Sequence, residues 1–224
     1  MFKYAFNYFL ILVCCLSLTS CFDIVEEINL KTNGSGSIQG TLNLSKSRTK
    51  AASLMKLDKI DGFKIPSEAE IRREMATVVR LLQNTKGISN VKHTLDFKNY
   101  IASISCDFQN VQALNAYTAT LAKHFKSNLN TYSNYSYNAG SKSFVRTYKH
   151  NPDATKEFNK LRAENQKSFD QAYYTSIYRF QDHVQKQNNG SGKISPNKQA
   201  VMVKVSIPSL ARGTTNLANT IQLK

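Results

Sequence analysis

The sequence predicts an α+β fold, in which an antiparallel sheet built from β-hairpins carries helices packed on one face. Runs of alternating apolar and polar residues come in pairs around short turns, and Asn33-Gly34-Ser35-Gly36 is the clearest of these turns. Asn-Gly between alternating runs is a strong hairpin signal. Residues 67–84 and 110–127 instead repeat their apolar side chains at helical spacing, which predicts two amphipathic helices.

The predicted strands and helices follow a recognisable order in the first half of the chain. Ser67 and Glu70 have the spacing of a capping box, so the first long helix begins there. Two further hairpins flank a second helix, which Asn110 can cap. The order β-α-β-β-α-β matches a ferredoxin-like unit over residues 36–137. Its members are 36–44, 67–84, 88–97, 100–108, 110–127 and 131–137.

The C-terminal part adds a third hairpin partner, a short helix and more strands. Pro152 suits the first position of the short helix. We expect one mature domain over residues 21–224, with a sub-boundary near residue 150. The predicted C-terminal segments are a strand at 142–150, strands at 173–184, 200–207 and 217–223, and a loop at 208–215.

Residues 45–66 carry six basic and two acidic side chains, interleaved with apolar ones. This pattern predicts a short basic amphipathic helix. Such a helix can lie on an anionic membrane, or its apolar side can simply cover the sheet. We favour the second interpretation.

The amino-terminal segment has the pattern of an export signal. Lys3 precedes an apolar run of ten residues, 9–18, which is too short to span a membrane and has the length of a signal-peptide core. Leu18-Thr19-Ser20-Cys21 then resembles the lipobox of bacterial lipoproteins. The resemblance implies that residues 1–20 are a signal peptide and that Cys21 is lipidated, its freed amine taking a fatty acyl group such as palmitate. The alternative is a signal peptide that happens to end near a cysteine.

Over residues 21–110 the chain resembles uncharacterised lipoproteins of Bacteroidota-type bacteria and, more distantly, LppM-type lipoproteins. The resemblance lies in the lipid cysteine, the strand that follows it, the Gly-rich turn and the second strand. It implies an envelope lipoprotein and assigns no further functional residue.

Charge and cysteine content narrow the functional classes. The mature chain carries 29 basic and 15 acidic side chains, a formal charge of +14. Such a charge favours anionic partners, and export makes nucleic acid an unexpected one. Cys106 is the one cysteine after Cys21, so no intramolecular disulfide is expected.

We find no pattern that predicts catalysis. The four histidines are far apart and have no metal-ligand spacing, and no phosphate loop, nucleophile elbow or nucleotide fingerprint occurs. His93 and Cys106 both lie in predicted strands, where a satisfied core residue is the more common role. We therefore expect no enzyme, no metal and no cofactor.

One group of residues predicts ligand binding. Tyrosines on exposed strands can stack on sugar rings or lie at a lipid interface, and nearby arginines favour acidic ligands. The alternative, which we favour, is cross-strand packing. The candidates are Tyr132, Tyr135, Tyr137, Tyr148, Tyr174, Tyr178, Arg146 and Arg179.

The expected function is a lipid-anchored, non-enzymatic envelope lipoprotein that acts as a binding module near the membrane surface. Its partner would be an envelope protein or an anionic glycan or lipid. The alternative is a periplasmic carrier or sensor of lipid-like or acidic glycan ligands. The expected location is the outer membrane.

Overall fold

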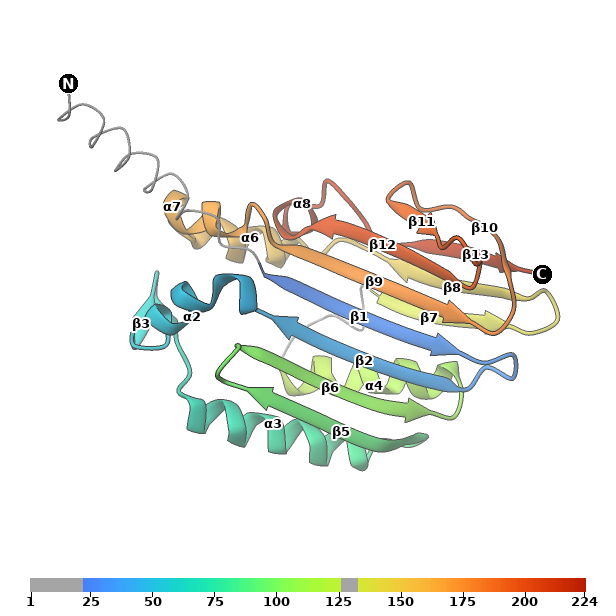
Figure 1. Ribbon diagram of the computed structural model, residues 1–224, viewed down its shortest axis with the longest axis horizontal. Helices are drawn as coiled ribbons and strands as arrows, with labels where there is room; N and C mark the ends of the chain where they lie inside the picture. The colour runs from blue at the N-terminus through green and yellow to red at the C-terminus, as the bar shows by residue number, and fades with distance from the viewer. Residues whose placement is uncertain (1–21, 126–132) are drawn as a thin grey trace, which may run out of the picture.

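A computed structural model describes residues 22–125 and 133–224 and confirms the α+β class. Its main sheet has seven strands in the order β11-β12-β9-β1-β2-β6-β5, and all neighbouring pairs are antiparallel except β1 and β9. Figure 1 shows this sheet face on. The strands are β1 (Asp23–Leu30), β2 (Gly36–Asn43), β5 (Ile88–Asp96), β6 (Ile101–Phe108), β9 (Tyr173–Phe180), β11 (Gly192–Ile194) and β12 (Ala200–Ser206).

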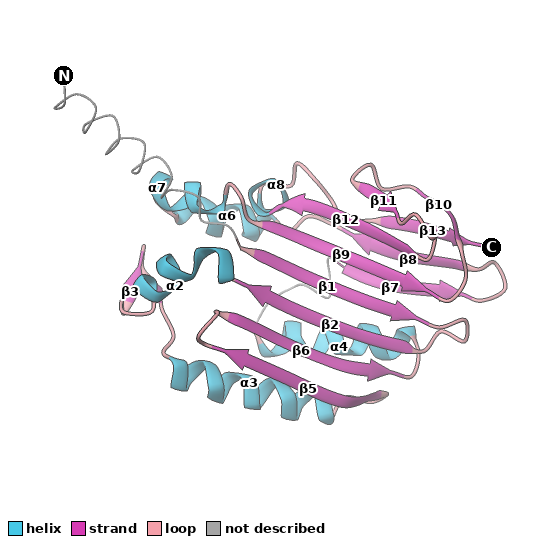
Figure 2. Ribbon diagram, in the orientation of Figure 1, coloured by secondary structure: helices cyan, strands magenta, loops and turns pink. Residues whose placement is uncertain are grey.

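A second layer covers one face of the main sheet (Figure 2). It contains a four-stranded antiparallel sheet in the order β10-β13-β8-β7, and helices α3 and α4 beside it. Asn115 of α4 exchanges two hydrogen bonds with the backbone of Tyr135 in β7, at 2.8 and 2.9 Å, which joins helix and sheet. The bounds are β7 (Ser133–Asn138), β8 (Ser143–Tyr148), β10 (Val184–Gln187), β13 (Asn219–Leu223), α3 (Glu68–Gln83) and α4 (Val111–His124).

The hydrophobic core lies between these two layers, and strand alternation sends every second side chain into it. Ile28, Ile38 and Val203 face inward from the main sheet, and Leu82 and Leu114 meet them from α3 and α4; each of these side chains is at most 3% exposed. No helix or strand of the described chain lies over the other face of the main sheet (Figure 1). Small polar side chains of β2 and β6 point to that face, which suits an antiparallel sheet with one side in water. They are Ser37, Gln39, Thr41, Ser103 and Ser105.

The predicted hairpins and caps are confirmed. The Asn33-Gly34 turn joins β1 to β2, and Gly34 has a φ of +82°, which favours glycine. A Cβ on Gly36 would lie 1.9 Å from the carbonyl oxygen of Asn29, so only glycine fits where β2 begins. At the start of α3 both hydrogen bonds of the predicted capping box are present.

The ferredoxin-like prediction is wrong in one strand. β2, β6 and β5 lie side by side with α3 and α4 on one face, as expected. The fourth strand, β7, instead belongs to the second sheet, and β1 occupies the position beside β2. The physical reason is that β1 is tied to β2 by a tight turn, which brings these strands together before any distant strand can compete.

Three local boundaries also differ from the prediction. The strand expected at 173–184 ends at Phe180, and β10 then starts in the other sheet. The loop expected at 208–215 begins as a helix, capped by the Ser206 hydroxyl. The basic segment 45–66 is only briefly helical and ends in a small hairpin. The helices and strands not yet given are η1 (Ser45–Ser47), α2 (Arg48–Leu54), β3 (Lys59–Ile60), β4 (Phe63–Lys64), α6 (Pro152–Lys160), α7 (Ala163–Gln166), η2 (Lys167–Phe169) and α8 (Ile207–Ala211).

The two halves of the chain share one sheet. β1 pairs with β9 along its whole length, from Asp23 opposite Tyr173 to Leu30 opposite Phe180. The core likewise contains residues from both sides of position 150.

Candidate functional site

Arg146 of β8 is the centre of a polar network between the two sheets. Its guanidinium donates to Glu26 Oε1 at 3.0 Å, and Tyr135 Oη donates to the same carboxylate oxygen at 2.9 Å. The guanidinium also lies 5.3 Å above the Tyr135 ring. Its other acceptors are Ser133 at 3.0 Å, Ser176 at 2.7 Å, Tyr178 at 3.0 Å and Tyr174 at 3.4 Å.

The network is buried, and this decides its electrostatics. Arg146 is 4% exposed and Tyr178 is 1% exposed. Burial disfavours the charged guanidinium, but the attraction of Glu26 and the neighbouring tyrosine oxygens together outweighs it, and the pKa of Arg146 is raised. Burial also raises the pKa of Tyr178, against the opposing pull of Arg146. At neutral pH the network therefore holds a charged Arg146 guanidinium paired with Glu26, together with protonated tyrosines. It joins the two layers of the fold.

Three of the side chains predicted to face a ligand, Tyr135, Tyr178 and Arg146, face inward and are buried. Tyr174 belongs to the same network, and burial raises its pKa too. These residues pack inside the fold, which is the alternative interpretation given above.

The other predicted residues lie apart from that network. Tyr137 donates to the carbonyl oxygen of Thr32 at 3.1 Å and supports the β1–β2 turn. Tyr148 is half-buried and lines a polar depression of about 660 Å³. Arg179 is exposed and pairs with Glu27 at 2.7 Å. Tyr132 and Cys21 lie outside the described residues.

Glu26 is the charged residue of the network that sequence reasoning missed. Two adjacent acids on a strand, such as Glu26 and Glu27, are most often surface residues. Glu26 nevertheless alternates in phase with Ile28, and its neighbour Glu27 does not. An acid on an otherwise apolar strand face needs a partner, and this was the available signal.

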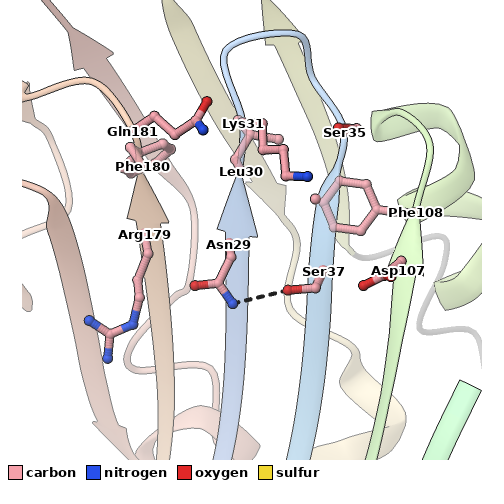
Figure 3. Close-up of a pocket in the computed structure, with 11 residues that line it drawn as sticks. Asn29, Leu30, Lys31, Ser35, Ser37, Asp107, Phe108, Arg179, Phe180 and Gln181 are labelled. Carbon is pink, nitrogen blue, oxygen red and sulfur yellow. Dashed lines mark hydrogen bonds between the residues drawn. The ribbon is translucent and has the colours of Figure 1, made fainter. Parts of the chain in front are cut away.

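A polar pocket of about 420 Å³ lies where β1 ends and β2 begins (Figure 3). Asn29 donates to the Ser37 hydroxyl at 3.1 Å across its floor, and Arg179 and Asp107 stand on its two sides. Because both charge signs are present, and Arg179 and Asp107 already bond to Glu27 and Asn90, this pocket favours no single class of ligand.

A second pocket of a different character lies at the opposite end of the main sheet, where β1 starts. We call it the Phe22 pocket. Its volume is about 400 Å³, and eleven of its fifteen lining residues are apolar or aromatic. They are Phe22, Leu42, Leu44, Ala51, Leu54, Met55, Ile60, Ile65, Tyr100, Leu161 and Phe169.

Polar side chains at this pocket are engaged with one another. Lys50 donates to the hydroxyl of Ser168. Asn165 donates to Asp61 at 2.7 Å, which lowers the pKa of that carboxyl. The fourth polar residue of the lining is Ser47, which is buried. The interior is thus suited to an apolar group.

The cysteine of the described residues, Cys106, is buried. Cys106 is 2% exposed, and burial raises the pKa of its thiol to about 12. The thiol is therefore protonated and shielded at neutral pH. Among residues 22–125 and 133–224, no group of three or more His, Cys, Asp or Glu side chains is placed to hold a metal ion.

Comparisons with known proteins do not assign the chain to a family. No known protein family and no curated protein matches the chain. Among solved structures, the NMR structure of the folded domain of LppM from Mycobacterium tuberculosis is similar, with a TM-score of 0.45 and 10% identity over 92% of this chain and 91% of that one. A likeness at this level carries no functional argument. None of the described helices combines the length and hydropathy that a membrane crossing needs.

Proposed function

We propose that this chain is a lipid-anchored protein of the cell envelope, whose folded domain is a non-enzymatic binding module at the membrane surface. The lipobox-like sequence ending in Cys21 supports the anchor. The fold then begins at once, because the backbone N–H of Tyr173 donates to the Phe22 carbonyl oxygen at 3.1 Å and β1 starts at Asp23. The domain is therefore held within a few residues of the expected lipid.

The observation that carries the membrane-surface role is the character of the end nearest the lipid. Segment 45–66 lies at the end of the main sheet where β1 begins (Figure 1). Leu57 and Phe63 of this segment are 49% and 37% exposed. Exposed cations beside exposed apolar side chains suit an anionic lipid interface. The exposed cations are Lys46, Arg48, Lys50, Lys56, Lys59 and Lys64.

Lipidation is tested in cells with the full chain and an alkyne fatty acid. We expect the label on the mature protein and its loss in Cys21→Ser, which leaves the precursor uncleaved. Equal labelling of both chains would remove the anchor from the proposal. Density-gradient fractionation of the same cells tests the proposed outer-membrane location.

Surface binding is tested with the unlipidated mature chain and vesicles that contain anionic lipid. Each cation near such a surface contributes about 1 kcal/mol, so replacing three should lower the partition coefficient roughly a hundredfold. The test variant changes Arg48, Lys56 and Lys59 to Gln.

A matched control removes the same charge from the opposite end of the molecule. It changes Lys186, Lys193 and Lys224 to Gln, on β10, β11 and the C-terminus (Figure 1). We expect near-normal vesicle binding. Equal losses in both triple variants would mean that net charge alone attracts the protein and that segment 45–66 has no special role.

A second function, a carrier or sensor of lipid-like molecules, is favoured by the Phe22 pocket alone. Lipid mass spectrometry of protein purified from membranes tests it, and a non-covalently bound lipid in stoichiometric amount is the supporting result. An anionic glycan or an envelope protein is the other proposed kind of partner, and a pull-down from solubilised membranes would recover it.

A further inference from the structure

The Phe22 pocket makes no hydrogen-bonding demand on an occupant. Three of its four polar lining side chains are engaged with neighbouring side chains, as described above, the fourth is the buried Ser47, and the other eleven lining residues are apolar or aromatic. Water in a pocket with this lining finds few hydrogen-bond partners, so the lining gains by contact with an apolar group. Its volume of about 400 Å³ lies within the range of small-ligand sites.

The position of this pocket in the chain identifies an occupant. Phe22 forms part of the wall, and its ring packs edge-on against Phe169 with centroids 5.4 Å apart. Its carbonyl oxygen is fixed by Tyr173, as described above. Consecutive Cα atoms lie 3.8 Å apart, so a lipid attached to Cys21 starts one residue from Phe22, which lines the pocket.

We propose that one acyl chain carried by Cys21 folds back into the Phe22 pocket. The inference rests on the proposed function, because it requires lipid on Cys21. Tethering gives this chain a high effective concentration that no free lipid shares. The pocket and the bilayer core offer similar gains per methylene, so the tethered chain divides between them.

The volume sets a limit on what enters. A lipoprotein-type cysteine carries two or three chains, and a pocket of about 400 Å³ holds one of them at most. On a cysteine with three chains, the two remaining chains stay in the bilayer, and two chains anchor a protein stably. Filling of the pocket therefore docks this end of the domain onto its own anchor while the protein stays on the membrane.

The test uses the mature chain 21–224 with its free Cys21 thiol. Alkylation with a maleimide that bears a brominated hexadecyl chain imitates the lipid. Cys106 is protected during this reaction, because it is 2% exposed and burial raises its thiol pKa to about 12. The sequence contains no tryptophan, so Tyr100→Trp in the pocket wall provides a single fluorescent reporter, which bromine quenches on contact.

We expect the long-chain adduct of monomeric protein to lose most of its tryptophan emission, and the N-ethylmaleimide adduct to keep it. Leu54→Lys places an amine in the pocket and should restore the emission. Leu57→Lys is the matched control on the same segment, because Leu57 is 49% exposed and does not line the pocket. It should leave the quenching intact, and circular dichroism checks that both variants fold.

Two results would overturn the inference. Quenching by free brominated palmitate but not by the tethered chain would assign the pocket to a foreign lipid. Quenching by neither would show that the pocket takes no acyl chain. Because the adduct is made chemically, these results are independent of whether cells lipidate Cys21, which the labelling experiment decides separately.

Discussion

Replacing Glu26 by Gln should destabilise the protein far more than the same change at the adjacent Glu27. Glu26 pairs with a guanidinium that is 4% exposed, and removing one partner of a buried ion pair costs about 3–5 kcal/mol. Arg146 keeps neutral acceptors on Ser176 at 2.7 Å and Tyr178 at 3.0 Å. We therefore expect the lower end, about 3 kcal/mol, which lowers the melting temperature by about 6–12 °C in a domain of this size.

The matched control is Glu27→Gln. Glu27 also pairs with an arginine, Arg179, at 2.7 Å, but the two side chains are 33% and 51% exposed. Exposed pairs contribute about 0–1 kcal/mol, so this change should have little effect. Urea unfolding followed by far-ultraviolet circular dichroism measures both variants by linear extrapolation.

A double-mutant cycle with Arg146→Met tests whether the cost comes from the pair itself. Removing both charges leaves no unpaired ion, so Glu26→Gln with Arg146→Met should cost clearly less than the sum of the single changes. Additive single effects, or equal effects of the Glu26 and Glu27 changes, would refute the reasoning.

Three further predictions concern local features. Asn110→Ala removes the side-chain cap of α4 and should cost about 1 kcal/mol in urea unfolding; no loss would deny the cap a role. In the chain 21–224 carrying Cys21→Ser, Cys106 should react with a thiol reagent at pH 8 only after urea is added, since burial raises its pKa to about 12; fast reaction of the folded protein would contradict this. A hydrogen bond from Lys64 helps lower the pKa of Glu70 to about 2. The stability that Glu70 contributes, and that Glu70→Gln removes, is therefore present at neutral pH and is lost as the pH falls from about 4 to 2. Unfolding of both proteins measured over a series of pH values tests this, and a difference that does not change with pH would contradict it.

Local sequence signals predicted the hairpins and caps because their causes are local. An Asn-Gly pair specifies the β1–β2 turn, and Ser67 and Glu70 satisfy each other within one helical turn. The place of β7 was not predictable in this way. The order of strands and helices was right, but which sheet takes a strand depends on competition between distant partners, and the Ser206 cap of α8 was simply overlooked.

The candidate sites depended on contacts between distant parts of the chain. Sequence reasoning selected Arg146 and its tyrosines by composition. It left open whether they face a ligand or pack between strands, and it favoured packing. Their partner Glu26 is 120 positions away, and alternation alone hinted at its inward direction. The Phe22 pocket could not be predicted from the sequence, since Leu42, Tyr100 and Phe169 come together only in the folded chain.

The parallel pairing of β1 with β9 has a consequence for the proposed passage of the chain to the cell envelope. In a chain that crosses a membrane with its amino terminus in front, β1 emerges long before β9. Asp23 is then exposed well before its partner Tyr173 has emerged. Until then one edge of β1 has no neighbour, and contacts of such sequence separation form slowly. An anchor acquired early would keep each emerging chain on its own patch of membrane during this interval. Attachment would then separate unfinished copies from one another, and the lipid would protect against aggregation before it serves any function of the finished domain.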